Sequence, residues 1–149
     1  KEIMMFIAPE GPVYQAGTLS GNPLATAAGW VVLNILSEKG IYETLEEKSA
    51  FLFGGMEEQA RSLGIPLRTT RVGSMGTLFF TQEGIKDYES VRRASTETYA
   101  RFYREMRRRG VYLAPSAFEA LFVSLAHSRQ DLEETVSAAG DVFRLLVGK

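Results

Sequence analysis

The stretch Gly11-Pro12-Val13-Tyr14-Gln15-Ala16-Gly17-Thr18-Leu19-Ser20-Gly21-Asn22-Pro23-Leu24-Ala25 determines how the first part of this sequence folds. Its Gly, Pro, Ser and Asn residues favour turns, because they supply unusual backbone angles or local hydrogen bonds. Asn22 followed by Pro23 is typical of a helix start, since asparagine caps free N–H groups and proline fits the first turn. The stretch therefore predicts a loop over residues 8–22 and a helix from Pro23.

The same loop has the composition of an anion-binding site. Residues 15–22 combine two glycines, two hydroxyls and a capped helix start. Glycines let backbone N–H groups approach a phosphate, hydroxyls donate further hydrogen bonds, and the helix dipole favours negative charge. Loops of this composition more often simply cap a helix, so the composition by itself leaves both interpretations open.

Hydrophobic periodicity predicts the remaining elements. We expect helices at residues 23–39, 41–63, 88–109 and 130–147, and short strands at 67–72, 77–81, 111–113 and 121–125. Gly40 is expected to end the first helix, and the spacing of Ser128 and Asp131 resembles a capping box at the start of the last helix. Helices and strands alternate without repeats, which predicts an α/β or α+β layer.

Composition excludes several classes of function. The chain has 149 residues, of which 45% are hydrophobic, and a formal net charge of −1, which gives no overall attraction for nucleic acid. It contains no cysteine and one histidine, His127, which excludes thiolate chemistry and a multi-histidine metal site. No stretch approaches the roughly 20 apolar residues of a membrane span, and no signal peptide is recognisable, so a cytoplasmic protein is expected. Residues 1–8 resemble the tail of a helix, which predicts a piece of a longer protein.

Three further groups are candidates for chemistry. Glu119 lies beside an aromatic residue in a loop before an apolar strand, where it is placed to hold a substrate amine, although an exposed loop carboxylate is the commoner outcome. His127 follows that strand, and a hydrogen-bonded surface histidine is favoured over a catalytic one. The arginines of residues 101–109 resemble a stripe that binds nucleic acid. Glu97 and Glu105 add negative charge to the same segment, so a solvated helix face is favoured instead.

Three motifs carry a resemblance to a known family. The stretch 11–25 closely resembles the phosphate loop of the glutamate-1-semialdehyde 2,1-aminomutases, pyridoxal-phosphate enzymes related to the class III aminotransferases. The resemblance continues at Val72-Gly73-Ser74-Met75 with Thr77-Leu78-Phe79-Phe80-Thr81. It appears again at Gly110-Val111-Tyr112-Leu113-Ala114-Pro115-Ser116 with Phe118-Glu119-Ala120 and Ser124-Leu125-Ala126-His127. It thus covers the whole chain in order.

The resemblance implies the C-terminal part of a fold type I pyridoxal-phosphate-dependent transferase. Residues 1–39 would be the end of the large cofactor-binding domain, with the phosphate and interface loop and a long helix, and residues 40–149 the small C-terminal α+β domain. In the family this loop binds the cofactor phosphate of the neighbouring subunit, which assigns that role to Gly17 and Thr18 and implies a homodimer. Glu119 matches the residue near the substrate, glutamate-1-semialdehyde, where related aminotransferases place an arginine. The family converts this substrate to 5-aminolevulinate for tetrapyrrole (porphyrin) synthesis.

The family's Schiff-base lysine has no counterpart in this sequence. It lies a few tens of residues before the phosphate loop, and none of the lysines here matches its motif: Lys1, Lys39, Lys48, Lys86 and Lys149. The isolated chain is therefore expected to be inactive. Two other interpretations stay open: a class III aminotransferase that uses an external amino donor, and a non-catalytic interaction module of the same fold.

Overall fold

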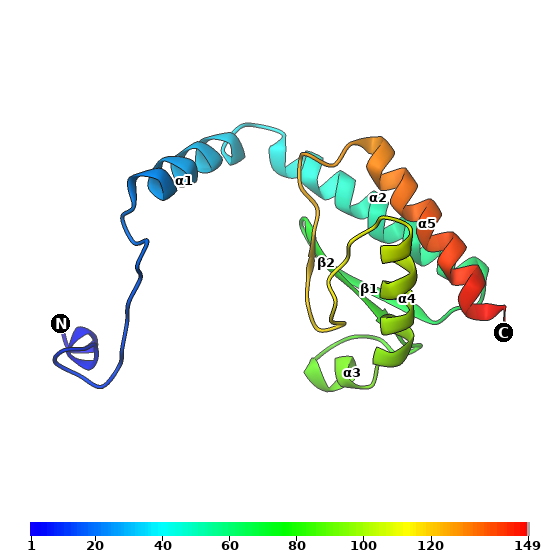
Figure 1. Ribbon diagram of the computed structural model, residues 1–149, viewed down its shortest axis with the longest axis horizontal. Coiled ribbons are helices and arrows are strands. Elements are labelled where there is room, and N and C mark those ends of the chain that lie inside the picture. Colours follow the sequence, from blue (N-terminus) through cyan, green and yellow to red (C-terminus); the bar gives the residue numbers. More distant parts are fainter. Residues whose placement is uncertain (149) are drawn as a thin grey trace. The chain divides into compact units, whose positions relative to one another are not determined.

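The computed structural model describes residues 1–148 and divides the chain into two compact units. The first unit ends at Glu38 and the second begins at Lys39. Figure 1 shows the elements of both units in chain order, and each unit is described by itself below.

The first unit consists of a short turn, a loop and one helix. The turn is the 3₁₀ helix η1 (Ile3–Phe6), so the expected helix tail over residues 1–8 is wrong. Ala8 donates its N–H to Val13 and Val13 donates to Phe6, which closes the chain into a tight loop where a helix would have to continue. The helix α1 (Pro23–Leu36) begins as predicted, with the Asn22 side chain accepting the N–H groups of Leu24 and Ala25 at 3.0 and 3.1 Å.

The end of α1 differs from the expectation. The helix stops at Leu36, three residues early, and Ser37 satisfies the Leu33 carbonyl with both its N–H and its hydroxyl. Gly40 has a φ of 90° and caps the start of the next helix. None of the residues of α1 is buried, and Trp30 is 67% exposed. All residues of α1 except the half-buried Leu36 are thus exposed.

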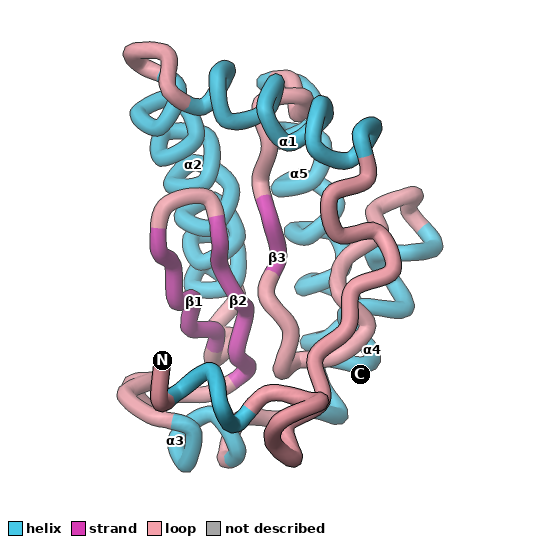
Figure 2. Tube along the Cα trace, turned by 90° about the vertical axis from the view of Figure 1, so that its left-hand side faces the viewer, coloured by secondary structure: helices cyan, strands magenta, loops and turns pink. Residues whose placement is uncertain are grey.

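The second unit packs helices against a small antiparallel sheet (Figure 2). Its elements are α2 (Ile41–Ser62), β1 (Leu67–Val72), β2 (Met75–Phe80), α3 (Tyr88–Arg92), α4 (Thr96–Arg108), β3 (Leu121–Phe122) and α5 (Arg129–Val147). The sheet order is β1-β2-β3, with Thr69 opposite Leu78 and Gly76 opposite Leu121. The turn between β1 and β2 uses Gly73, whose φ of 55° suits glycine.

One core joins α2, α4, α5 and the sheet. Its largest fully buried side chains include Phe53, Met56, Leu78, Phe102 and Phe143. The rings of Phe102 and Phe143 stack with centroids 5.1 Å apart, which ties α4 to α5. Helical spacing puts Met56, Phe102 and Phe143 on apolar faces of their helices, and the structure buries all three.

Two glycines allow close packing within this core. A Cβ on Gly76 would overlap the Phe53 ring, so the absent side chain lets α2 approach β2. A Cβ on Gly55 would lie 2.9 Å from Cγ2 of Val136, so Gly55 lets α2 approach α5. Its neighbour Gly54 faces open space.

The expected helix at 88–109 is two helices. Ser95 separates them, because its N–H donates to the Phe80 carbonyl and its hydroxyl accepts the N–H of Thr98 at the start of α4. The expected strand at 111–113 does not form, and the strand expected at 121–125 is limited to Leu121–Phe122. Leu113 and Val123 are buried in the core, and Val111 and Leu121 pack against it, so side-chain packing rather than a long strand pairing holds these segments.

Candidate functional site

The candidate phosphate loop presents free hydrogen-bond donors. Ser20 donates its N–H to the Gly17 carbonyl at 2.9 Å and Asn22 donates to Leu19 at 3.0 Å, which shapes the loop as two successive turns. The N–H groups of Gly17 and Thr18 and the Thr18 hydroxyl have no hydrogen-bond partner within residues 1–148, and both residues are exposed. A Cβ on Gly17 would overlap the Ser20 hydroxyl oxygen, so a larger residue here would force the Ser20 side chain to rotate. The loop can therefore donate to an anion.

The helix that follows is not itself the anion site. Asn22 Oδ1 already accepts the N–H groups of Leu24 and Ala25, and Pro23 has no N–H. The free donors of the first turn are thus used by the cap. Donation to an anion consequently falls to Gly17 and Thr18.

Glu119 ends a tight turn in the segment that leads into β3. Its N–H donates to the Ser116 carbonyl at 3.2 Å, and the Ser116 hydroxyl accepts the N–H of Phe118 at 3.1 Å. The Glu119 residue is exposed, and its carboxylate has no hydrogen bond or ion pair within the described part of the chain. The carboxylate is thus available to a cationic ligand group.

A buried tyrosine lies beneath this segment. Tyr99 of α4 is 3% exposed, and its hydroxyl donates to the Ala114 carbonyl at 2.7 Å. Burial, followed by the negative charge of Glu119, raises the pKa of Tyr99 to about 12. Helical spacing puts Tyr99 on the apolar face of residues 88–109, but the sequence does not reveal this contact, because the partner carbonyl lies 15 residues away.

His127 has the structural role that its sequence context favours. Its Nδ1 accepts the Ser124 N–H at 2.9 Å, and Lys48 Nζ donates to the carbonyls of Leu125 and His127 at 2.8 and 2.6 Å. The Ser128 hydroxyl, followed by its N–H, donates to the Asp131 carboxylate and lowers the pKa of Asp131 below its usual value. This network caps α5 and confirms the expected capping box.

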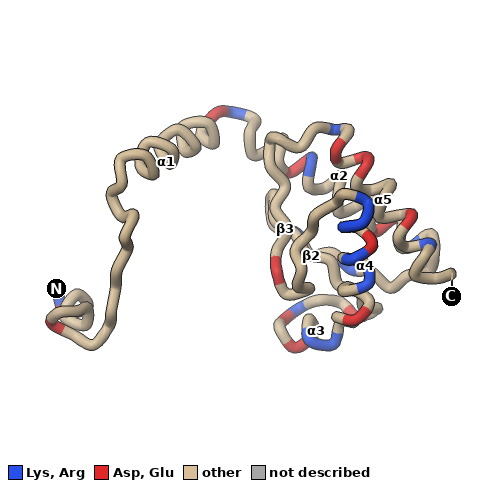
Figure 3. Tube along the Cα trace, viewed as in Figure 1, with Lys and Arg blue, Asp and Glu red and all other residues tan. Residues whose placement is uncertain are grey.

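The arginines of α4 are partly neutralised on their own helix (Figure 3). Glu105 pairs with Arg108 and, at 3.1 Å, with Arg109. The hydrogen bond from Arg109, followed by the charge of Arg108, lowers the pKa of Glu105. These pairs are consistent with the solvated helix face that the sequence favours.

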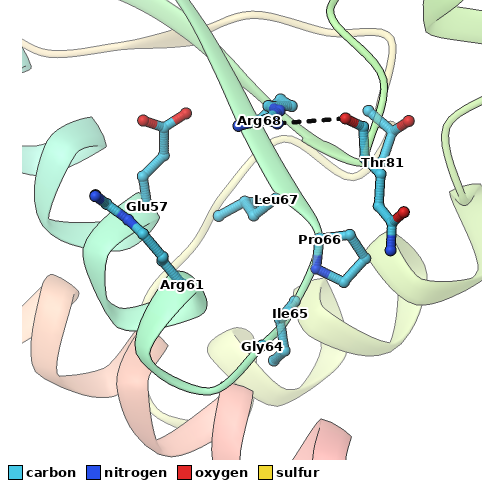
Figure 4. A pocket seen from close by; sticks show the side chains of 9 residues that line it. Glu57, Arg61, Gly64, Ile65, Pro66, Leu67, Arg68 and Thr81 are labelled. Carbon is cyan, nitrogen blue, oxygen red and sulfur yellow. Dashed lines mark hydrogen bonds between the residues drawn. The ribbon is translucent and has the colours of Figure 1, made fainter.

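One pocket of the second unit is lined by none of the candidate residues. Its volume is about 710 Å³, and it lies where α2 ends and β1 begins (Figure 4). Its charged groups already have partners: Glu57 accepts the Thr69 N–H at 2.6 Å, Arg61 pairs with Glu58, and Arg68 donates to the Gln82 carbonyl. The pocket is not lined by Gly17, Thr18 or Glu119.

Residues 1–148 contain no cluster of three or more potential metal-ligating side chains. None of their helices is long and apolar enough to cross a membrane.

The three predicted site residues fall in different units. Gly17 and Thr18 belong to the first unit and Glu119 to the second. They are therefore two separate candidate groups, one that can donate to an anion and one that offers a free carboxylate.

Solved structures with the same fold are transaminases and an aminomutase. An omega-transaminase from Sphaerobacter thermophilus matches with a TM-score of 0.74 and 21% identity over 96% of this chain and 33% of its own. A glutamate-1-semialdehyde-aminomutase from Pseudomonas aeruginosa matches with a TM-score of 0.76 and 21% identity over 93% of this chain and 31% of its own. The chain thus has the fold of the corresponding part of the pyridoxal-phosphate-dependent transaminases.

Curated relatives narrow this class to one family. The glutamate-1-semialdehyde 2,1-aminomutase of Syntrophobacter fumaroxidans is 52% identical over 143 residues, which cover 96% of this chain and 33% of the relative. That of Citrifermentans bemidjiense is 47% identical over 98% of this chain and 34% of the relative. No family model matches the chain. The chain belongs to the glutamate-1-semialdehyde 2,1-aminomutase family, and it spans about one third of the length of these relatives.

Proposed function

We propose that this chain is the C-terminal portion of an enzyme that converts glutamate-1-semialdehyde to 5-aminolevulinate, a step of tetrapyrrole synthesis. The observation that carries the proposal is the roughly 50% identity to aminomutases over nearly the whole chain. The enzyme would move an amino group between adjacent carbons of one substrate. The same resemblance supports a cytoplasmic homodimer.

The cofactor would be pyridoxal 5'-phosphate, and the first unit has groups that fit its phosphate. The free N–H groups of Gly17 and Thr18 and the free Thr18 hydroxyl are the donors that a phosphate requires. We assign them to the cofactor held by the neighbouring subunit. When bound, the cofactor supplies an electron sink for the reaction.

Glu119 would orient the substrate. Its carboxylate is exposed and unpaired among the described residues, so an ammonium group of the substrate can bind it without first breaking an internal ion pair. A carboxylate here would repel a second carboxylate. The residue thus disfavours a ligand that places its carboxylate at this position, as an external amino donor bound through its carboxylate would.

The lysine that binds the cofactor covalently would lie outside this chain. Lys48 is occupied by the carbonyls of Leu125 and His127, and Lys1, Lys39 and Lys86 match no cofactor-binding motif. Lys149 lies outside the described residues. We therefore propose that the isolated chain is inactive.

An assay without an amino donor tests the proposal. The full-length protein, loaded with cofactor, is given glutamate-1-semialdehyde alone, and formation of 5-aminolevulinate is measured. The aminomutase forms product under these conditions. A requirement for an external amino donor would instead identify an aminotransferase, and no turnover with or without a donor would identify a non-catalytic module.

A further inference from the structure

We propose that Tyr99 is a positioning residue that fixes the Glu119 segment, residues 114–120, for substrate binding. The inference rests on the proposed role of Glu119 and assigns a function to a buried hydroxyl outside the family motifs read from the sequence. Tyr99 itself is 3% exposed, so it acts through the segment rather than by contact with substrate.

The Glu119 segment has little regular structure of its own. It contains no helix or strand, and its internal hydrogen bonds close a single turn between Ser116 and Glu119. A free segment of this kind would sample many conformations, because each unfixed residue retains its backbone entropy. The position of the Glu119 carboxylate therefore depends on attachment to the rest of the fold.

The segment is attached at its start, middle and end. The Tyr99 hydroxyl donates to the Ala114 carbonyl at 2.7 Å, the methyl group of Ala117 is buried in the core, and the Thr77 hydroxyl donates to the Glu119 carbonyl at 3.4 Å. The bond from Tyr99 is the shortest of the hydrogen bonds to this segment. It is also less exposed to solvent than the bond from Thr77, so competition from water is weaker there.

The Tyr99 hydroxyl remains a donor over the whole working range of pH. Burial and the Glu119 charge raise the pKa of Tyr99 to about 12, so the proton stays on the phenol. The negative charge of Glu119 thus supports the protonation of the group that holds its own segment.

Tyr99→Phe removes this hydroxyl and keeps the ring in the core. Tyr103→Phe is the matched control: it lies on the same helix, its ring packs against Tyr112, and its hydroxyl has no hydrogen bond within residues 1–148. A general effect of losing a tyrosine hydroxyl on α4 would appear in both variants.

The first measurement is amide hydrogen exchange at Glu119 in this chain. Tyr99→Phe is expected to speed that exchange by roughly 2- to 10-fold, the range for loss of one hydrogen bond, while Tyr103→Phe leaves it unchanged. Unchanged exchange in Tyr99→Phe, or equal acceleration in both variants, would overturn the positioning role whether or not the protein is an aminomutase.

The second measurement is a double-mutant cycle on kcat/KM in the full-length enzyme. Tyr99→Phe is expected to lower kcat/KM by roughly 2- to 10-fold in the wild-type background and to have no effect in the Glu119→Gln background. An equal loss in both backgrounds would show that Tyr99 does not act through Glu119. If Glu119→Gln alone left kcat/KM unchanged, the proposed role of Glu119 would fail, and with it the role of Tyr99 for substrate.

Discussion

The two adjacent glycines of α2 should respond oppositely to the same substitution. Gly54 faces open space, and a Cβ on Gly55 would lie 2.9 and 3.0 Å from the two methyl carbons of Val136 on α5. Both residues lie inside a helix, where alanine is favoured over glycine by about 1 kcal/mol. Gly54→Ala is therefore expected to raise the free energy of unfolding by up to about 1 kcal/mol.

Gly55→Ala brings the same gain in helix propensity, but it also adds a steric clash with Val136. Carbon atoms pack best at about 3.5–4.0 Å, so the new methyl group and Val136 must move apart by more than half an ångström. Valine is stiff and cannot rotate away cheaply. Overpacking of this kind costs about 1–3 kcal/mol, which outweighs the helical gain and leaves Gly55→Ala neutral to destabilising by about 2 kcal/mol.

Urea unfolding of this chain, followed by circular dichroism, measures both changes. Val136→Ala should rescue Gly55→Ala, so the double variant is expected to be more stable than the sum of the single changes by about 1 kcal/mol or more. Gly54→Ala with Val136→Ala should be additive and serves as the control. If Gly55→Ala stabilised the chain as much as Gly54→Ala, the close packing of α2 on α5 would be refuted.

Three other residues or groups give independent tests. Ser49 is fully buried and its hydroxyl has no partner within residues 1–148, so Ser49→Ala should stabilise the chain by about 0.5–2 kcal/mol in urea unfolding; a lower midpoint would contradict this. The hydrogen bonds from Ser128 lower the pKa of Asp131, so their contribution to stability is present above the unfolded pKa near 3.8 and is lost as pH falls through the lower folded pKa. Asp131→Asn should accordingly flatten the fall in melting temperature below pH 4, and an unchanged slope would count against the cap. Addition of pyridoxal 5'-phosphate to this chain, followed by desalting, should leave no adduct at a single lysine in mass spectra, and one stable modified site would show that a cofactor-binding lysine is present after all.

The sequence predicts those elements whose cause is local. Asn22 before Pro23 and Ser128 before Asp131 fix helix starts through contacts within three residues, and both caps form as expected. The pair of strands around Gly73 is equally local, since a turn with positive φ joins them.

The failures occur where distant contacts override the local pattern. The apolar spacing of residues 88–109 continues through Ser95, and the break arises because Ser95 bonds to Phe80 on β2. Residues 111–113 have the composition of a strand but lack a partner strand among the described residues, and Leu113 packs in the core instead. The fold alone brings Tyr99 to Ala114, so the sequence does not predict the hydrogen bond between them.

The candidate site, too, is only partly predictable from local sequence. The glycines and hydroxyls around Gly17 and Thr18 already suggested an anion loop, and the structure adds that the helix start is occupied by Asn22. The assignment of that anion as a cofactor phosphate came from resemblance, because composition could not separate an anion loop from a simple helix cap.

The most direct test of the site concerns Thr18 in the full-length dimer. Loss of its hydroxyl removes a hydrogen bond to a charged phosphate, worth about 1.5–3 kcal/mol, so Thr18→Ala should weaken cofactor binding by roughly 10- to 150-fold. Mixed dimers then pair one Thr18→Ala subunit with one subunit whose cofactor-binding lysine is inactivated, and their aminomutase activity is measured at limiting cofactor. If Thr18 serves the neighbouring subunit, both defects fall in one site, the other site stays intact, and the mixed dimers keep about half of the wild-type activity. Activity no higher than that of the Thr18→Ala homodimer would contradict the account, because the threonine would then serve its own subunit.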